Sequence, residues 1–243
     1  MQKPCSISAF FPCYNDGGTI ASMVALADLT LRRITDDYEI IVVDDGSSDH
    51  SREILKELEG KYLRLRLVFH EKNKGYGGAL RSGFAACRKE WVFYTDGDFQ
   101  YDVAELTLLL AGAAEGVDIV NGYKISRSDP LHRKVIGRLY HYLMKRLFHF
   151  TIRDVDCDFR LIRRRALNRI VLEHDSGVIC VEIVKKLQNR GCVFAEVPVH
   201  HFFRSYGRSQ FFNLKRVTDV GVDILKLWWK LVVKKGKTKE IIQ

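Results

Sequence analysis

The sequence predicts an α/β fold in which a mostly parallel central sheet is flanked by helices. Three apolar runs of strand length, at residues 7–11, 38–43 and 91–95, are each followed by residues with helical spacing. Strands that alternate with helices form right-handed βαβ units, whose strands run parallel. Each run also stops at polar residues, and open parallel sheets bind ligands beyond such strand ends. We therefore expect a ligand-binding crevice at one edge of the sheet.

The first predicted unit joins the strand at residues 7–11 to a helix over residues 17–33. The connection reads Pro12-Cys13-Tyr14-Asn15-Asp16. Asn and Asp are both good N-cap residues. Asp16 therefore either caps this helix or contacts a ligand in the crevice.

The second unit joins the strand at residues 38–43 to a helix that extends to about Lys61. The connection Asp44-Asp45-Gly46-Ser47-Ser48-Asp49 contains two kinds of polar residue. The two serines and Asp49 directly precede the helix and are expected to cap it. Asp44 lies at the strand end itself, where a cap is not needed, and so indicates a ligand contact.

A glycine-rich segment follows at residues 73–83, with four glycines before and within a predicted helix start. Glycine allows close approach of the backbone to a ligand, and a helix N-terminus favours phosphate. The spacing matches neither the Walker nor the dinucleotide-binding pattern. Lys74 is a candidate contact to a phosphate or a base.

The third strand stops at Asp96-Gly97-Asp98-Phe99-Gln100. Two carboxylates one residue apart provide the hard oxygen ligands that Mg²⁺ or Mn²⁺ uses to bridge to phosphate oxygens. A simple Asp-Gly-Asp turn is the alternative. Alternate residues of a regular strand face opposite ways, so Gly97 is expected to turn the chain and bring both carboxylates to one ion.

The C-terminal half combines basic and apolar residues at helical spacing. A helix over residues 131–150 carries both kinds, a strand is expected over residues 192–199, and a second amphipathic helix over residues 211–233 ends near Trp228, Trp229 and a lysine-rich tail. Such helices lie either at a membrane surface or against the sheet. The simplest division is a catalytic domain at residues 1–210 and a C-terminal helix with a basic tail at residues 211–243.

The chain resembles the family 2 glycosyltransferases of the GT-A fold, most closely the dolichol-phosphate (polyprenyl-phosphate) sugar transferases. Five segments carry the resemblance, and they occur in the family's order. Residues 12–16 resemble the family's P-x-Y-N-E motif, residues 43–49 resemble V-D-D-G-S-x-D, residues 73–79 resemble N-x-G-x-G-x-A, and residues 96–100 resemble D-x-D-x-Q. The fifth segment combines residues 154–160, which resemble D-x-x-x-G-F-R, with residues 204–209, which resemble R-x-x-G-x-S. Asp16 replaces the usual Glu, Asp158 the usual Gly, and Gln210 a frequent Lys.

The resemblance implies a role for each matching residue. The donor nucleotide sugar would be contacted by Pro12, Tyr14, Asp16, Asp44, Asp45, Lys74, Asp96, Gly97, Arg204 and Ser209. A Mg²⁺ or Mn²⁺ ion would be held by Asp96, Asp98 and Gln100. Asp156 and Asp158 would orient the acceptor or the sugar, and Arg133 would bind the acceptor's phosphate.

Composition and charge narrow the class of protein. Hydrophobic residues make up 47% of the 243 residues, which is ordinary for a globular domain. The net charge of +9 implies an anionic partner, but the acidic crevice and the lack of a nucleic-acid motif argue against nucleic acid. The six cysteines include no C-x-x-C pair, and no signal-like segment is evident, which favours a reducing, cytoplasmic location.

No stretch approaches the roughly 18 apolar residues that span a bilayer. We therefore expect a peripheral protein on the cytoplasmic face of an anionic membrane, with or without a membrane-protein partner. The expected activity is inverting, metal-dependent transfer of a sugar from GDP-mannose or a UDP-sugar to a polyprenyl or dolichyl phosphate. The alternatives are a soluble glycan or protein acceptor and a non-catalytic nucleotide-binding subunit.

Overall fold

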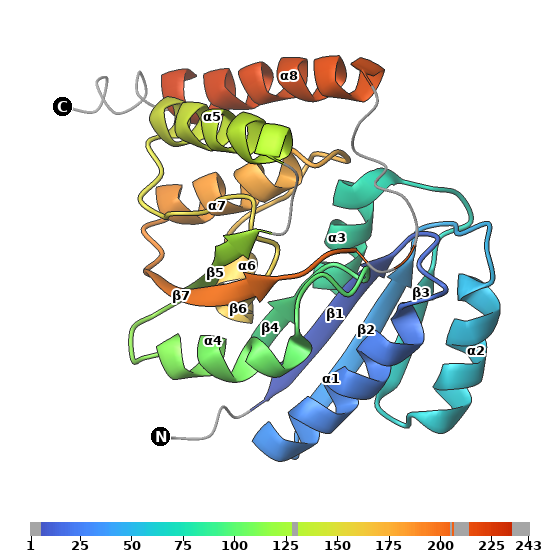
Figure 1. The fold of residues 1–243 in the computed structure, drawn as a ribbon. Coiled ribbons are helices and arrows are strands. Elements are labelled where there is room, and N and C mark those ends of the chain that lie inside the picture. Colours follow the sequence, from blue (N-terminus) through green and yellow to red (C-terminus); the bar gives the residue numbers. More distant parts are fainter. Residues whose placement is uncertain (1–5, 128–130, 205, 207–213, 235–243) are drawn as a thin grey trace.

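The computed structural model describes residues 6–127, 131–204, 206 and 214–234. They form one seven-stranded sheet in the order β3-β2-β1-β4-β6-β5-β7 (Figure 1). The strands are β1 Ile7–Cys13, β2 Tyr38–Asp44, β3 Leu65–Phe69, β4 Trp91–Tyr94, β5 Ile119–Arg127, β6 Arg160–Arg163 and β7 Phe194–His201.

The predicted mostly parallel sheet is confirmed, with one antiparallel strand that the sequence did not indicate. Strand β6 pairs antiparallel with both β4 and β5, whereas the other neighbours are parallel. Its first residue, Arg160, therefore lies opposite Tyr94, the last residue of β4. The start of β6 thus joins the edge at which the parallel strands end.

Helices cover both faces of the sheet. They are α1 Ile20–Ile34, α2 Ser51–Lys61, α3 Gly75–Ala86, α4 Leu106–Gly112, α5 Leu131–Phe148, α6 Arg164–Leu167, α7 Ile179–Asn189 and α8 Leu214–Trp228, with a 3-10 turn at Val103–Glu105 and a π-helical turn at Trp229–Val233. Helix α1 begins at Ile20, three residues later than expected, because residues 17–19 form a turn.

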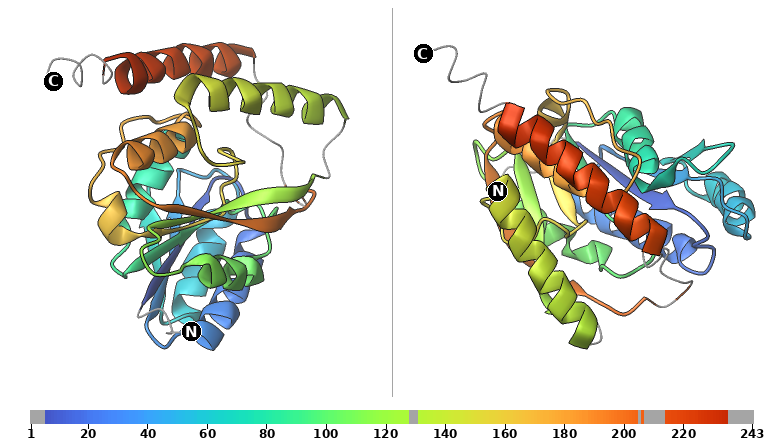
Figure 2. Two further views of the ribbon diagram at one scale, coloured as in Figure 1. Left: turned by 90° about the vertical axis from the view of Figure 1, so that its left-hand side faces the viewer. Right: turned by 90° about the horizontal axis from the view of Figure 1, so that it is seen from above.

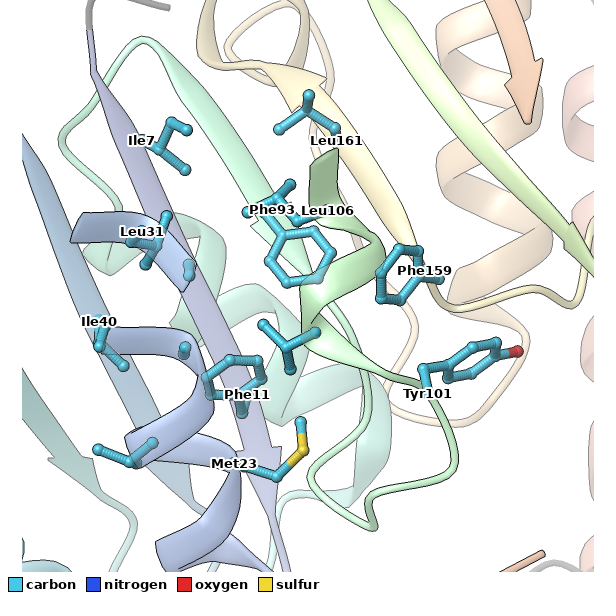
Figure 3. Close-up of a cluster of buried hydrophobic side chains, with 14 of the residues drawn as sticks. Ile7, Phe11, Met23, Leu31, Ile40, Phe93, Tyr101, Leu106, Phe159 and Leu161 are labelled. Atoms are coloured by element: carbon cyan, nitrogen blue, oxygen red, sulfur yellow. The ribbon is translucent and has the colours of Figure 1, made fainter. Parts of the chain in front are cut away.

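Strand β1 separates two cores because its side chains alternate between the faces. Ile7 and Phe11 pack with α1 in the first core, which also contains Phe93 and Phe159 (Figure 3). Phe10 points the other way, into a second core with residues of α3 and α7. This double covering explains why the strands read as continuous apolar runs.

A third apolar cluster joins α5 and α8 to α7. The two long helices lie side by side above α7 (Figure 2). Met144 and Phe148 of α5 and Ile224 and Leu227 of α8 are buried there. Trp228 Nε1 also donates a hydrogen bond to the Leu147 carbonyl, 3.0 Å away. Helices α5 and α8 therefore form a joint layer on the domain.

Candidate functional site

The candidate site lies at the edge where β1, β2 and β4 end and β6 begins. The first of these connections supplies Asp16, whose side chain is buried. Its carboxylate accepts from the Tyr14 backbone nitrogen at 3.2 Å, while its carbonyl accepts from Thr19 and Ile20 at the start of α1. Burial, with nearby Asp98, raises the pKa of Asp16 to about 6. The carboxylate thus does not cap α1, and the contact of Asp16 with a ligand stays a prediction.

Asn15 ties the first connection to the second. It has a left-handed backbone, with φ of 58°, and its side-chain oxygen accepts from the Ser48 nitrogen at 2.8 Å. Its own nitrogen donates to Ser47 Oγ at 3.0 Å. The prediction that these two serines cap α2 is therefore wrong, because they bond to Asn15 and so join the loop after β2 to the loop after β1. Asp49 alone contacts the helix start, where its carboxylate accepts from the Ser51 nitrogen.

Asp44 is fully buried at the end of β2. Its Oδ2 accepts from Arg52 Nε at 2.9 Å and forms an ion pair with Arg52 Nη2 at 2.7 Å, and its Oδ1 accepts from the Ser47 nitrogen at 3.3 Å. Arg52, on α2, was not identified from the sequence, because only the helix packing brings it back to the strand end. The guanidinium compensates a carboxylate that would otherwise be costly to bury.

Asp45 holds the glycine-rich segment against β2. Its Oδ1 accepts from the Lys74 backbone nitrogen at 2.8 Å and lies 2.6 Å from His70 Nδ1. Its carbonyl accepts from the Asn73 side chain at 3.1 Å. The Lys74 side chain itself is exposed. It is therefore accessible to a ligand.

The glycines at the start of α3 make room for protein backbone. A Cβ at Gly77 would lie 2.2 Å from the His174 carbonyl oxygen, and the Gly77 nitrogen donates to the Asp175 carbonyl at 2.8 Å. The sequence suggested close approach to a ligand here. The observed close approach is to the chain segment that leads into α7.

Asp96 and Asp98 follow β4 directly. Asp96 Oδ1 accepts from the Tyr76 hydroxyl at 2.6 Å, and burial together with the charges of Asp158 and Asp98 raises the pKa of Asp96 well above its usual range. Asp98 is buried, and its Oδ2 lies 2.5 Å from Arg204 Nη2. The two carboxylates therefore share one concentration of negative charge, which Arg204 only partly offsets.

Gly97 and Phe99 shape this loop in different ways. The left-handed residue is Phe99, with φ of 61°, so the expected turn at Gly97 occurs two residues later. Gly97 instead allows close approach to β1, since a Cβ there would lie 2.6 Å from the Pro12 carbonyl oxygen. Thr19 Oγ1 also donates to the Gly97 carbonyl at 2.9 Å. The carboxylate loop is thus fixed to both β1 and α1.

Gln100 links the carboxylate loop to the segment after β7. Its side-chain Nε2 donates to the Phe202 carbonyl at 3.0 Å, and the Phe202 nitrogen donates to the Gln100 carbonyl at 2.8 Å. The amide is thus directed at this segment, two residues before Arg204. The Tyr206 ring packs on Gly18, where a Cβ would lie 2.3 Å from it. Ser209 lies outside the described residues.

A buried polar network surrounds the start of β6. Arg160 is fully buried and donates to Asn121 Oδ1 at 2.6 Å, to the Tyr94 hydroxyl and to the Val155 carbonyl. Asp158 Oδ1 lies 3.4 Å from the Tyr94 hydroxyl and 3.6 Å from Arg160 Nη1. The network positions Asp158 beside Asp96. Tyr94 and Arg160 were not among the predicted site residues, because their contact depends on the antiparallel pairing of β6. Tyr76 was not predicted either, because the packing of α3 brings its hydroxyl to Asp96.

The segment before β6 holds the other predicted acceptor residues. Lys124 Nζ donates to the Asp156 carbonyl at 2.7 Å and lies 3.6 Å from Asp154 Oδ2. Burial, with the charges of Asp154 and Asp158, raises the pKa of Asp156 to about 6. Arg133 is in the first turn of α5, and its side chain lies outside the described part of the structure.

The donor set fits a Mg²⁺ or Mn²⁺ ion shared with a ligand. Within the described residues, no group of three or more His, Cys, Asp or Glu side chains is arranged to hold a metal by itself. Mg²⁺ commonly takes one or two carboxylates and completes its shell with water and substrate phosphates. Asp96 and Asp98 provide such an incomplete set, and a cation there would offset their repulsion.

Residues 8–171 match the glycosyl transferase family 2. The chain is 27% identical over 225 residues to an undecaprenyl-phosphate 4-deoxy-4-formamido-L-arabinose transferase of Yersinia enterocolitica, covering 92% of this chain and 68% of the relative. The transferase of that name from Yersinia pestis is 26% identical over 220 residues, with 90% and 66% covered. The chain thus spans about two thirds of the length of these relatives.

Solved structures show the same fold. Glucosyl-3-phosphoglycerate synthase from Mycobacterium tuberculosis, in complex with Mn²⁺, uridine diphosphate and glucosyl-3-phosphoglycerate, has a TM-score of 0.71 at 18% identity, over 93% of this chain and 79% of that one. Its complex with Mg²⁺ and uridine diphosphate has a TM-score of 0.68.

The sheet order and the carboxylates at its edge define a GT-A type nucleotide-sugar fold. The chain belongs to glycosyl transferase family 2, and it is a glycosyltransferase. Both the predicted fold and the predicted family are therefore confirmed. No helix in the described part of the chain is long and apolar enough to cross a membrane.

Proposed function

We propose that this glycosyltransferase moves a sugar from a nucleotide sugar to a polyprenyl phosphate, with inversion at the anomeric carbon and with a divalent cation. The observation that carries the metal-dependent step is the pair Asp96 and Asp98, which lie in one buried concentration of negative charge beside Asp158. The two Yersinia relatives, named for transfer to undecaprenyl phosphate, support the acceptor class.

The cation follows from electrostatics. The diphosphate of a donor brings at least two negative charges to Asp96 and Asp98, and repulsion at about 4 Å in a partly desolvated crevice costs several kcal/mol. A bound Mg²⁺ or Mn²⁺ would stabilise the departing diphosphate as a Lewis acid. Asp96 and Asp98 would hold it. Gln100 is retained as a third ligand from the resemblance alone, because its side-chain nitrogen bonds Phe202.

The donor would lie across the ends of β1, β2 and β4. In this proposal Asp16 and Tyr14 face the nucleoside, while Pro12, Asp45 and Gly97 shape the surface beneath it. Asp44 is assigned to the nucleoside by resemblance, although its side chain is fully buried against Arg52. Lys74 and Arg204 contact the phosphates, as does Ser209 by resemblance. Arg204, now paired with Asp98, would turn to the diphosphate when donor and cation arrive together.

The chemical step needs little beyond positioning. An ionised oxygen of the acceptor phosphate attacks the anomeric carbon in line, the bond to the diphosphate oxygen breaks, and the nucleoside diphosphate leaves with that electron pair. No proton is transferred, because the attacking phosphate is already ionised. Asp156 and Asp158 orient the acceptor or the sugar, and Arg133 binds the acceptor's phosphate.

We also propose that the α5 and α8 layer lies on the cytoplasmic face of an anionic membrane. Six large apolar side chains on these helices are half or more exposed: Leu139, Tyr142, Leu143, Val222, Leu225 and Trp229. Lysines and arginines such as Lys145, Arg146, Lys226 and Lys230 accompany them and are exposed too. Apolar residues with flanking cations are typical of interfacial helices. A membrane-protein partner is the other occupant that this surface would suit.

Substitution of a metal ligand tests the proposed step. Asp98→Ala should reduce transfer by at least about a hundredfold, because the diphosphate would lose its cation clamp. The fold should persist, since the side chain lies at a loop. Asp36→Ala, which removes an exposed carboxylate at the α1–β2 connection, is the matched control and should transfer at the normal rate. Undiminished transfer by Asp98→Ala would contradict a metal role for this residue.

A further inference from the structure

His70 occupies a buried position between three elements next to the proposed nucleotide subsite. It directly follows β3 and is only 4% exposed. Its backbone nitrogen donates to the Asp44 carbonyl at 2.9 Å. Its Nδ1 lies 2.6 Å from Asp45 Oδ1, and its Nε2 lies 2.8 Å from Ser82 Oγ on α3. Neither His70 nor Ser82 takes part in the proposed chemical step.

The partners determine how the imidazole is protonated. The Asp45 carboxylate can only accept, so Nδ1 carries a proton and donates it to Oδ1. In the neutral ring Nε2 then accepts from the Ser82 hydroxyl. The result is a directed chain from the Ser82 hydroxyl through the ring to the Asp45 carboxylate. These hydrogen bonds fix the rotation of the Asp45 carboxylate.

The orientation of Asp45 in turn controls the glycine-rich segment. The same Oδ1 atom accepts from the Lys74 backbone nitrogen at 2.8 Å, immediately before α3 begins at Gly75. The Asn73 side chain donates to the Asp45 carbonyl at 3.1 Å. Rotation of the carboxylate would therefore release the segment that carries Lys74 into the crevice. His70 would thus act on a ligand only through Asp45, without contacting the ligand itself.

A serine, a histidine and an aspartate in series also occur in nucleophilic triads. The surroundings of Ser82 do not support that chemistry. Ser82 lies inside α3, where the neighbouring backbone N–H groups are bonded within the helix and cannot form an oxyanion hole. Gly83, beside it, packs directly on the Phe10 ring.

We propose that His70 is a positioning residue for the donor's nucleotide, acting through Asp45 on the Asn73–Gly77 segment, with Ser82 holding its ring. This inference rests on the proposed function, in which Lys74 of that segment contacts the donor's phosphates. Nucleotide affinity should therefore depend strongly on the hydrogen bond from His70 to Asp45, and much less on the hydrogen bond between His70 and Ser82.

Two amide substitutions separate the two ends of the ring. In His70→Asn the amide nitrogen takes the place of Nδ1 and can still donate to Asp45. In His70→Gln it takes the place of Nε2, so Asp45 loses the donor at residue 70 and keeps only the Lys74 backbone nitrogen on that oxygen. The dissociation constants of uridine and guanosine diphosphate, with Mn²⁺, are measured by calorimetry. For the nucleotide that binds, we expect His70→Gln to raise the constant about tenfold and His70→Asn at most about threefold.

Kinetics and stability distinguish positioning from a general structural role. His70→Gln should raise the KM for the nucleotide sugar far more than it lowers kcat. Ser82→Ala, which keeps the donor to Asp45, should raise the dissociation constant only about two- to threefold. Tyr38→Phe is the matched control, since it removes another buried hydrogen bond to a carboxylate, the 2.6 Å contact with Asp28. It should lower the melting temperature without changing nucleotide affinity.

The outcomes separate this inference from the function on which it rests. If wild-type protein binds neither nucleotide, the proposed function fails, and the inference fails with it. If wild type binds but His70→Asn and His70→Gln bind equally well or equally poorly, the inference alone is overturned. Loss of all transfer in Ser82→Ala with nucleotide affinity intact would also overturn it, because Ser82 would then take part in the chemistry.

Discussion

Asp16 carries its charge in a place that disfavours it. The carboxylate is buried near Asp98, which raises its pKa from 3.8 to about 6. Because its pKa is higher in the folded state, the contribution of this carboxyl group to stability is fully present below about pH 4 and is lost as the pH rises through 6. At neutral pH the folded protein therefore bears a cost that only a bound cation or ligand would relieve.

Asp16→Asn should consequently raise the free energy of unfolding at pH 7.5, by about 1–2 kcal/mol. The amide removes the cost of burying a charged carboxylate, and residual hydration of the site keeps the gain small. The amide oxygen can still accept from the Tyr14 nitrogen. Urea denaturation at pH 7.5 and pH 4 measures the effect, which should vanish at pH 4. The exposed-site variant Asp36→Asn should show no gain; a less stable Asp16→Asn protein at pH 7.5 would contradict the burial argument.

Single residues were predictable from sequence where strand ends alone placed them. Asp44, Asp96 and Asp98 follow apolar runs directly, and the parallel sheet brings these ends to one edge. Arg52 and Arg160 were not predictable as site residues, because long-range packing determines their partners. Asp49 was expected among the helix caps and does contact α2, whereas Ser47 and Ser48 bind Asn15, a contact that depends on the left-handed backbone at residue 15.

At the scale of elements, α5 and α8 depart from the usual pattern of a helix packed on a sheet. Each buries one apolar side in their joint core and exposes another. The sequence indicated the amphipathic pattern of both helices but could not say which apolar residues pack inward. The structure separates Trp228, half-buried and hydrogen-bonded to Leu147, from Trp229, which is 51% exposed.

Trp229→Ala should weaken binding to phosphatidylglycerol vesicles several-fold, because an indole at an interface contributes apolar contact area. Its melting temperature should stay near that of wild type, whereas Trp228→Ala should lower it. Leu63→Ala removes a fully exposed apolar side chain at the α2–β3 connection, away from α5 and α8, and serves as the control. Sedimentation at about 0.01 M and 0.15 M salt should show weaker binding at the higher value, since the Debye length falls from about 30 to 8 Å. If the Trp229→Ala protein bound vesicles as tightly as wild type, the proposal that this surface lies on a membrane would be contradicted.

At the scale of the whole molecule, the order of the sheet explains why distant segments share one site. Strands β1, β2 and β4 end at the edge where the antiparallel β6 begins, and the segment after β7 returns there with Arg204. The parallel part of this arrangement followed from the βαβ pattern of the sequence. The reversal at β6 did not, because a four-residue strand carries too little pattern to indicate its direction.

The central claim is metal-dependent transfer to a polyprenyl phosphate, and product analysis tests it most directly. Purified protein is incubated with Mn²⁺ or Mg²⁺, a short polyprenyl phosphate and each of a panel of radiolabelled nucleotide sugars, and the anomeric configuration of the product is determined. We predict that a GDP- or UDP-sugar yields a polyprenyl phosphate sugar with inverted configuration, and that excess chelator abolishes its formation until cation is restored. Product formation at full rate in excess chelator, or transfer to soluble glycans with none to the lipid phosphate, would contradict the claim.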